Sequence, residues 1–285
     1  MRRQPPLPVR DGLGPARLRL QGGSVADEFG RRFGSAGTAK VLAGEVVDAD
    51  GVVINTTTCK PAGAVVFLYR DLPDEVVVPF DMPVLYRDDD IVVVDKPHFL
   101  ATMPRGGHVV QTALVRLRRE LGLPELSPAH RLDRLTAGVL LFTARREVRG
   151  AYQTLFARGL VRKTYLARSS AHTSVDFPTV VRSRIMKRRG HFQAVEEPGE
   201  PNAETLIEAL GDARYRLTPR TGRTHQLRVH MASLGIPIDN DSLYPAVIDV
   251  AADDFSSPLQ LVAHRLEFDD PLSGAHRAFA SSVEL

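Results

Sequence analysis

The stretch from Pro128 to Phe142 reads PAHRLDRLTAGVLLF. It places a single acid, Asp133, between Arg131 and Arg134, and an apolar run follows soon after. This order predicts a polar loop that leads into a buried strand, with Asp133 held at the entrance to the strand. Loops held by rigid elements are common positions for catalytic groups, so Asp133 is a candidate catalytic residue. A surface ion pair with a neighbouring arginine is the alternative interpretation.

A second informative stretch, from Leu217 to Ile238, reads LTPRTGRTHQLRVHMASLGIPI. A turn at Thr221-Gly222 and apolar residues at helical spacing from Leu227 to Leu234 predict a helix that ends at Gly235. Arg223 then lies near the start of the helix. Its guanidinium group could reach a carboxylate on a neighbouring loop from there.

Three shorter stretches read VLYRDDDIVVVDKP from Val84 to Pro97, VRKTYLA from Val161 to Ala167 and LVAHRLEF from Leu261 to Phe268. In this order, the five stretches resemble the signature motifs of the RluA family of pseudouridine synthases. Asp133 matches the family's essential aspartate, and Tyr165 matches the tyrosine that faces the target uracil. The resemblance implies an isomerase that converts specific uridines in ribosomal or transfer RNA to pseudouridine.

After residue 80, strand patterns outnumber helical patterns. The predicted strands are 91–94, 139–143, 163–167, 203–210, 214–217, 259–268 and 278–283, and the predicted helices are 112–121, 148–157 and 224–234. Regular alternation of strands and helices is missing, as are the glycine-rich motifs that bind dinucleotides and nucleoside triphosphates. We therefore expect an α+β fold. The resemblance specifies the pseudouridine synthase catalytic fold, with a large, mainly antiparallel central sheet flanked by helices and loops.

The resemblance implies three catalytic residues, Asp133, Tyr165 and Arg223. Asp133 acts as a nucleophile or as the base that takes a ribose proton, and the sequence leaves both roles open. Arg223 is the expected ion partner of Asp133. Tyr165 is expected to pack against the uracil and to help carry the proton from carbon-5. No cofactor or metal is expected, because His225 and His230 fall on different faces of the predicted helix and no acid ligand accompanies them.

The expected RNA-binding residues are Arg131, His130, Lys187, Arg188 and Arg228. A uridine in folded RNA must leave the base stack before chemistry can take place on it. The resemblance implies that Arg131 fills the vacated space and that His130 supports the loop. Lys187, Arg188 and Arg228 are expected to contact phosphates.

Positive charge is concentrated in one part of the chain. The segment from Arg116 to His191 holds 17 Lys and Arg against 5 Asp and Glu, a balance of +12, whereas the rest of the chain carries −9. The stretch from Arg182 to His191 has few acids nearby in the sequence with which to pair. A field of this sign suits a polyanion such as RNA. Solvated helix faces are the alternative interpretation.

The composition, 285 residues with 43% hydrophobic side chains, is typical of a globular protein. The sequence has no run of about eighteen apolar residues that could span a membrane, and its first residues lack the apolar core of a secretory signal. We therefore expect a cytoplasmic protein that needs no membrane, and the family resemblance implies a monomer that needs no protein partner. The single cysteine, Cys59, excludes an internal disulfide and a cysteine-built zinc site.

We expect two domains, a small N-terminal α/β domain at residues 1–80 and the catalytic domain at residues 81–285. The first contains an extended or mobile stretch from Arg2 to Gly23, a helix capped by Ser24, a helical turn at 38–42, a hairpin through Asp50-Gly51 and a strand at 64–69. Pro73, Pro79 and Pro83 mark the expected linker. The domain weakly resembles the alpha-L-type RNA-binding module, and a plain structural appendage is the alternative.

Two other functions compete with the enzyme. A catalytically silent RNA-binding or RNA-folding protein on the same scaffold would account for the basic segment and for altered glycines. The family usually has Gly-Asp-x-x-Tyr-Gly where this chain has Asn240 and Pro245 in place of the glycines. An aspartate-dependent hydrolase is the third, and the flanking motifs do not support it. Intact Asp133, Tyr165 and Arg223 favour the synthase.

Overall fold

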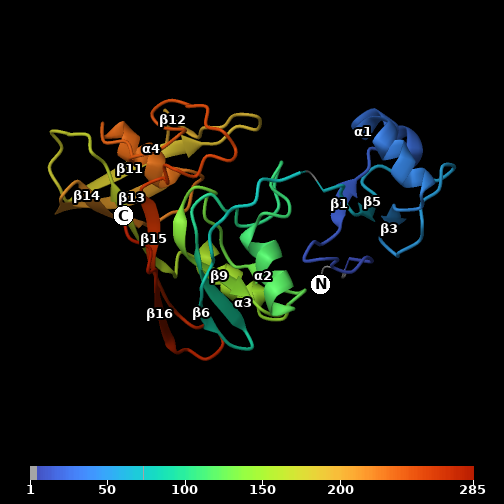
Figure 1. Ribbon diagram of the computed structural model, residues 1–285, viewed down its shortest axis with the longest axis horizontal. Coiled ribbons are helices and arrows are strands. Elements are labelled where there is room, and N and C mark those ends of the chain that lie inside the picture. Colours follow the sequence, from blue (N-terminus) through green and yellow to red (C-terminus); the bar gives the residue numbers. More distant parts are fainter. Residues whose placement is uncertain (1–4, 73) are drawn as a thin grey trace. The chain divides into compact units, whose positions relative to one another are not determined.

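The computed structural model describes residues 5–72 and 74–285, and the chain forms two compact units, Met1–Asp74 and Glu75–Leu285 (Figure 1). The sequence predicted this division after residue 80. Pro73 of the expected linker and residues 1–4, which begin the expected mobile stretch, lie outside the described residues. In the described ranges, no helix is both long and apolar enough to cross a membrane.

The smaller unit packs one interrupted helix against short strands. Strands β1 (Ala16–Arg19), β5 (Val65–Leu68) and β3 (Val47–Asp48) form an antiparallel sheet in that order, and β2 (Gly23–Ser24) pairs with β4 (Cys59–Lys60). Helix α1 (Val25–Leu42) begins at Ser24, whose hydroxyl accepts a hydrogen bond from the Asp27 amide, as predicted. Gly34 has a φ of 67° and divides the helix into two parts. A Cβ on Gly37 would lie 2.5 Å from the Phe29 carbonyl oxygen, so glycine lets the two parts pack closely.

Two predictions for the smaller unit were incomplete. No strand was expected between Arg2 and Gly23, yet β1 forms there, because Ala16 and Leu18 pack towards the apolar core of the unit. The expected turn at Asp50-Gly51 is present, with the Gly51 amide donating to the Asp48 carbonyl oxygen at 3.1 Å. The chain that returns from this turn makes an isolated bridge to β3 and does not form the second strand of a hairpin.

The larger unit is built on an eleven-stranded sheet. Its strands are β6 (Val84–Arg87), β7 (Ile91–Lys96), β8 (Ser127–Pro128), β9 (Ala137–Thr143), β10 (Arg162–Arg168), β11 (Thr179–Met186), β12 (Val195–Glu197), β13 (Ala203–Gly211), β14 (Arg214–Pro219), β15 (Leu261–Asp269) and β16 (His276–Ala280). The main order is β12-β11-β13-β14-β10-β15-β9-β7-β6, with β16 beside β15 and β8 beside β9. The pairing of β15 with β9 is parallel and the other described pairings in this sheet are antiparallel, which confirms the expected α+β fold with a mainly antiparallel sheet.

Strands β6, β8, β11 and β12 were not among the predicted strands. Strand β11 contains two arginines, Arg182 and Arg184. They interrupt the apolar pattern of a strand, so this stretch was interpreted as a basic segment. Strand β16 begins two residues before the predicted range 278–283 and overlaps its first part.

Helices α2 (Ala113–Leu121), α3 (Arg149–Ala157) and α4 (Gln226–Ser233) lie where the sequence predicted them. Strands β7 and β9 are buried along their whole length, because α2 packs on one face of them and α3 on the other. Helix α4 packs on the other half of the sheet, against β10, β13, β14 and β15 (Figure 1). The apolar core of the unit is therefore divided among these three helix–sheet contacts.

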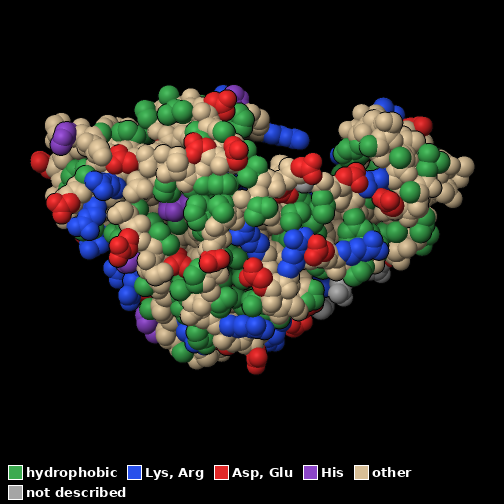
Figure 2. Space-filling model, viewed as in Figure 1, with side chains coloured by type: hydrophobic (Ala, Val, Ile, Leu, Met, Phe, Trp, Pro, Cys, Tyr) green, Lys and Arg blue, Asp and Glu red, His purple; other side chains and the backbone are tan. Residues whose placement is uncertain are grey.

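The basic segment pairs with acids from other parts of the chain. The guanidinium of Arg145 lies 2.5 Å from the Asp90 carboxylate, Arg182 lies 2.8 Å from Glu204 and Arg188 lies 2.6 Å from Glu197. The expectation that Arg182–His191 has too few acids with which to pair was therefore wrong for both Arg182 and Arg188. Acidic and basic side chains are interspersed on the face of the molecule seen in Figure 2.

Gly138 allows the two halves of the sheet to join. It lies in β9 opposite Ala263 of β15, in the parallel pairing. A Cβ on Gly138 would lie 2.3 Å from the Ala263 carbonyl oxygen, and its φ of 110° is one that residues with side chains rarely adopt. The glycine of the Thr-Ala-Gly motif is thus needed for the backbone contact between β9 and β15.

We expect Gly138→Ala to lower the free energy of unfolding by about 3 kcal/mol or more, because the new methyl group overlaps the β15 backbone and the φ is unfavourable. Gly150→Ala is the matched control, since Gly150 lies in α3 with open space around it. It should leave stability unchanged or raise it by up to about 1 kcal/mol. Urea denaturation measures both. Equal stability of the two variants would contradict this account of the strand contact.

Candidate active site

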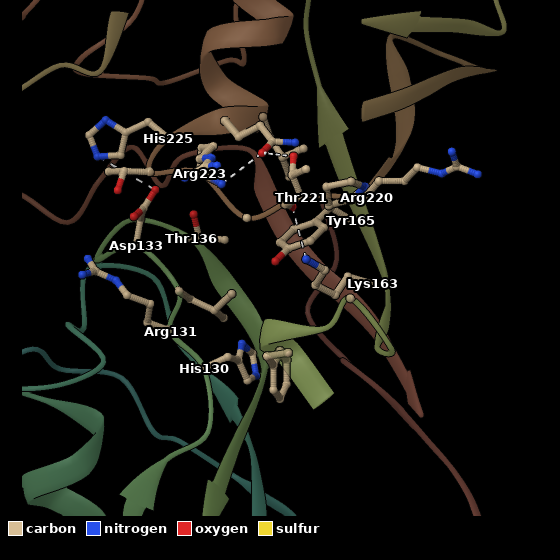
Figure 3. Close-up of a pocket in the computed structure, with 18 of the residues that line it drawn as sticks. His130, Arg131, Asp133, Thr136, Lys163, Tyr165, Arg220, Thr221, Arg223 and His225 are labelled. Carbon is tan, nitrogen blue, oxygen red and sulfur yellow. Dashed lines mark hydrogen bonds and ion pairs between the residues drawn. The ribbon is translucent and has the colours of Figure 1, made fainter. Parts of the chain in front are cut away.

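A cavity of about 740 Å³ opens where the loop before β9 meets the start of α4. Asp133 and Thr136 line it from the loop, Lys163 and Tyr165 line it from β10, and residues 219–228 line it from the turn and helix after β14 (Figure 3). It therefore joins the motif around Asp133, the strand that contains Tyr165 and the second long motif. These segments lie far apart in the sequence.

Three side chains, one from the last residue of β7 and two from the segment after it, hold the loop that contains Asp133. The Thr102 hydroxyl donates to the Leu132 carbonyl oxygen at 2.8 Å and accepts from the Leu132 amide at 3.1 Å. The ring of His98 lies 2.7 Å from the Leu135 carbonyl oxygen, through Nδ1. The ammonium group of Lys96 donates to the Arg134 carbonyl oxygen, which lies between these two points of the loop. The backbone on both sides of Asp133 is thereby anchored, which fixes the position of its carboxylate.

Lys96 is fully buried and its ammonium group is surrounded by backbone oxygens. It donates to the carbonyls of Pro97 at 2.9 Å, Leu100 at 2.8 Å and Arg134 at 3.3 Å. Burial lowers the pKa of Lys96 to about 7, although the negative charge of Asp133 opposes the shift. Three carbonyl acceptors match the three protons of an ammonium group. Lys96 thus connects the end of β7 to the Asp133 loop.

His130 supports the same loop from its other end. Its ring stacks on Phe156 with centroids 4.5 Å apart, and its Nε2 accepts a hydrogen bond of 3.1 Å from the Leu141 amide. Burial, assisted by the positive charge of Lys163, lowers the pKa of His130 to about 3. The ring is neutral at physiological pH and carries its proton on Nδ1. This arrangement agrees with the expected support of the loop, and it gives His130 no charge with which to bind RNA.

The ion partners of Asp133 differ from the prediction. Within the described residues, the basic side chains with a nitrogen within 4.0 Å of its carboxylate are Arg228, with Nη1 at 3.9 Å, and His225, with Nε2 at 4.0 Å. Arg223 is exposed, and its Nε donates to the Asn202 carbonyl oxygen at 3.1 Å. The prediction that Arg223 pairs with Asp133 was therefore wrong. Arg228 is the third residue of α4. Arg223 precedes the helix, and its side chain extends towards the β11–β13 region.

Arg228 is also not available as a phosphate contact, which corrects a second prediction. Its side chain is 2% exposed and forms a bidentate pair with Asp241, whose side chain is fully buried, at 2.7 and 2.5 Å. Burial alone would lower the pKa of Arg228, but its hydrogen bonds to Asp241 and the charge of Asp133 raise it. Arg228 is thus a permanent buried cation between two carboxylates.

Side-chain hydrogen bonds of Asn240 and Asp241 hold the loop that lacks the two glycines. Asn240 replaces the first glycine and has a φ of 62°, a conformation that asparagine tolerates better than most residues. Its side-chain amide donates to the Pro258 carbonyl oxygen at 3.0 Å. Asp241 accepts from the backbone amides of Leu243 and Tyr244 at 2.8 and 3.1 Å. The loop therefore still brings Asp241 to Arg228.

Tyr165 extends from β10 into the cavity, on the side opposite to Asp133 (Figure 3). It pairs with Leu217 of β14, and it lies at an irregularity in the pairing of β10 with β15, between Thr164 and Leu166. Burial and the nearby charge of Asp133 raise the pKa of Tyr165, which keeps the phenol protonated. The structure thus places a flat ring with a proton donor across the cavity from the Asp133 carboxylate.

The remaining predicted RNA contacts lie on the surface. Arg131 is exposed beside Asp133, and Lys187 and Arg188 are exposed near the end of the β11–β12 hairpin. Figure 2 shows a basic side chain projecting from this hairpin. Arg188 is paired with Glu197, but the charge of Lys187 is close enough to His225 to contribute to lowering its pKa. Hence the hairpin brings positive charge towards the cavity.

His225 and His230 act separately, as expected from their helix faces. His230 is fully buried, with Nδ1 2.9 Å from the Thr205 hydroxyl and Nε2 3.1 Å from the Ser183 hydroxyl, and it attaches α4 to the sheet. His225 instead faces Asp133, a role that the sequence did not predict. In the described part of the chain, no group of three or more His, Cys, Asp or Glu side chains could hold a metal ion.

The sequence did not indicate a role for Lys96, Asp241 or Tyr244 at the site, and it indicated other roles for His225 and Arg228. All five occur within stretches already noted as motifs, which was the available signal. Their partners come from other segments, so the sequence alone did not indicate which of the three arginines in the second motif faces the carboxylate.

Comparison with known proteins shows what this chain is similar to. The model of the RNA pseudouridylate synthase family matches residues 90–233. The dual-specificity RNA pseudouridine synthase RluA of Yersinia pestis is 31% identical over 214 residues, covering 71% of this chain and 100% of that protein. An uncharacterized RNA pseudouridine synthase of Synechocystis is 29% identical over 205 residues, 70% of each chain.

Solved structures with the same fold include two human proteins. Human RNA pseudouridylate synthase domain containing 4 superposes with a TM-score of 0.55 at 25% identity, covering 70% of this chain and 88% of that one. Human RNA pseudouridylate synthase domain containing 1 gives a TM-score of 0.57 at 24% identity, covering 71% and 84%. These proteins thus share the α+β fold of the larger unit.

We expect the stability of the protein to fall between pH 7.5 and pH 5 in part through His130. The pKa of this ring is about 3 in the folded protein and near 6.5 when unfolded, so only the unfolded chain gains a proton in this range. The loss should be about 2 kcal/mol for this residue. Urea denaturation of His130→Gln, which keeps an acceptor for the Leu141 amide, should show a pH dependence smaller by that amount. An unchanged pH dependence would contradict a buried neutral ring.

Arg228→Met and Arg223→Met test the corrected ion partner. Loss of Arg228 leaves the buried Asp241 carboxylate unpaired, so we expect the free energy of unfolding to drop by about 3 to 5 kcal/mol. Loss of Arg223 removes one exposed hydrogen bond and should cost less than about 1 kcal/mol. Chemical denaturation compares them directly. A larger loss for Arg223→Met would show that the assignment is reversed.

Proposed function

Because the chain belongs to the RluA family of RNA pseudouridine synthases, whose members are isomerases, we propose that Asp133 is the residue through which it isomerises uridine. We further propose ribosomal or transfer RNA as the substrate and the cytoplasm as the site of action. The observation that carries the proposal is the half-buried Asp133 carboxylate. It faces Arg228 and His225 in the cavity, with Tyr165 on the opposite side.

The reaction breaks the bond between the ribose and the uracil nitrogen, turns the uracil within the site and joins the ribose to carbon-5 of the base. Carbon-5 then loses its proton and the ring nitrogen released from the ribose gains one, so the product has the same composition as the substrate. A carboxylate near the ribose can attack the anomeric carbon or take a ribose proton. Both routes require Asp133 to be charged and fixed in position. The anchored loop and the cation of Arg228 support these requirements.

Tyr165 is proposed to hold the uracil during its rotation. Aromatic rings pack well against a planar base, and the proposed site places the ring on the far side of the cavity from Asp133. Its protonated phenol could also help to carry the proton that leaves carbon-5. Arg223, which the resemblance suggested as a catalytic residue, lines the cavity but has no ion pair with Asp133 among the described residues. We propose that its exposed guanidinium contacts RNA.

Uridine in folded RNA must be extruded to reach this cavity. Arg131 is exposed next to Asp133, which supports its proposed position in the space that the uridine leaves. Lys187 and Arg188 on the β11–β12 hairpin are proposed phosphate contacts, since cations on a projecting loop can follow the RNA backbone. The smaller N-terminal unit is proposed to add RNA contacts.

We expect pseudouridine at one or a few sites of ribosomal or transfer RNA to disappear in cells without the gene and to return with the wild-type chain but not with Asp133→Ala. Carbodiimide labelling and sequencing of total RNA measure this. Purified Asp133→Ala should be at least about a thousandfold slower than wild type on the RNA identified. Asp212→Ala, at an exposed turn, is the matched control and should restore the sites.

An unchanged map in the absence of the gene would contradict the proposed RNA substrates. Restoration of the sites by Asp133→Ala would contradict the proposed role of Asp133 and favour a silent RNA-binding or RNA-folding protein. A test for released base or cleaved strands in the same reactions distinguishes isomerisation from hydrolysis.

A further inference from the structure

The hydroxyl group of Tyr244 lies behind the catalytic site, at the junction of three segments. It is 2.9 Å from Nδ1 of His225, it accepts a hydrogen bond of 2.6 Å from the Ala194 amide, and it is 2.9 Å from the Ala194 carbonyl oxygen. Tyr244 is 7% exposed, so these contacts exclude water. Ala194 immediately precedes β12 at the base of the projecting hairpin. One hydroxyl thus connects the hairpin to the residue that faces Asp133.

The ring of Tyr244 also lies against both neighbours of Asp133, His225 and Arg228. Its centroid lies 5.7 Å from that of His225 in an edge-to-face arrangement, and the Arg228 guanidinium carbon lies 5.3 Å from it. Its backbone amide donates to Asp241, the partner of Arg228. The ring therefore has little freedom to move, and the hydroxyl has a fixed position relative to His225.

The hydrogen bonds of the hydroxyl decide which nitrogen of His225 carries a proton. Burial lowers the pKa of His225, with the charge of Asp133 opposing the shift, so near neutral pH the ring has one proton. If Tyr244 donates to Nδ1, the proton lies on Nε2 and points towards Asp133, whose carboxylate oxygen is 4.0 Å away. If Tyr244 donates to the Ala194 oxygen instead, Nδ1 must donate to Tyr244 and the lone pair of Nε2 faces a carboxylate.

The first arrangement is favoured, because an N–H group is attracted to a carboxylate and a lone pair is repelled by it. In that arrangement the Ala194 amide donates to Tyr244, Tyr244 donates to His225, and His225 presents a proton to Asp133. Each donor in this series of contacts therefore points to an acceptor. Tyr244 itself lies too deep to meet the substrate.

We infer that Tyr244 is a positioning residue whose hydroxyl holds His225 in the tautomer with the proton on Nε2, so that an N–H group faces the Asp133 carboxylate. The inference rests on the proposed function for its effect on the reaction. The tautomer itself can be observed without any RNA.

Nitrogen-15 NMR of protein labelled at its nine histidines tests the tautomer directly. Long-range proton–nitrogen correlations near pH 7.5 distinguish a ring protonated on Nε2 from one protonated on Nδ1, and the His225→Gln variant identifies the His225 signals. We expect wild-type His225 to carry its proton on Nε2 and Tyr244→Phe to show a mixture of both forms. A wild-type ring protonated on Nδ1, or an identical spectrum of His225 in Tyr244→Phe, would overturn the inference.

Kinetics tests the consequence for catalysis. Tyr244→Phe should lower kcat about tenfold and leave KM for RNA unchanged, because the lost donor acts on the charge of Asp133 across 4.0 Å and not on RNA binding. Tyr215→Phe is the matched control. Tyr215 is 9% exposed in the core, and in the described part of the chain its hydroxyl makes no hydrogen bond, so its loss should leave kcat unchanged.

A double variant separates tautomer control from a general loss of structure. Glutamine at position 225 can place an amide N–H where Nε2 was, and it needs no partner to fix a tautomer. Tyr244→Phe should therefore change kcat less than twofold in the His225→Gln protein. A tenfold decrease there as well would show that the hydroxyl acts by another route. A wild-type protein that forms no pseudouridine would instead contradict the proposed function, and the NMR result would still decide the tautomer.

Discussion

The buried pair of Arg228 and Asp241 is the interaction on which the arrangement of the site depends. Both side chains are almost completely removed from water, and a buried charge without a partner costs several kcal/mol. The two residues therefore have to meet, and they come from α4 and from the loop that follows it. Asp241 also accepts from the amides of that loop, so one carboxylate fixes both the helix and the loop. With both bidentate bonds used on Asp241, the remaining nitrogen of Arg228 is directed towards Asp133.

The parallel pairing of β9 with β15 positions the other part of the site, the loop that contains Asp133. The Asp133 loop ends where Gly138 meets the backbone of β15, and the side chains of Lys96, His98 and Thr102 hold the loop from the opposite side. The site thus lies where the two halves of the sheet meet. A carboxylate anchored by one half faces the Arg228 cation and the His225 ring anchored by the other. A preorganised charge of this kind needs little rearrangement when the substrate arrives.

Much of this organisation could be predicted from the sequence. The apolar spacing of 112–121, 148–157 and 224–234 indicated the three helices of the larger unit, and the apolar run after Asp133 indicated the buried strand β9. Ser24 marked the start of α1 because its hydroxyl caps an amide three residues later. The motif order identified the family and Asp133 and Tyr165 as site residues, which the cavity brings together. These features depend on local spacing and local hydrogen bonds, which a sequence records directly.

The sequence by itself determined the class of fold, the order of the elements and the short list of candidate residues. Only the tertiary structure decided which residues of that list face one another. Arg223 and Arg228 are five positions apart in the same motif, and the rotation of α4 selects Arg228 for Asp133 and Asp241 while Arg223 turns to the surface. The acids that neutralise Arg182 and Arg188 become neighbours only through strand pairing of β11. The physical reason is common to these cases: charge pairing in a folded chain depends on distance and burial, and both are set by contacts between segments remote in sequence.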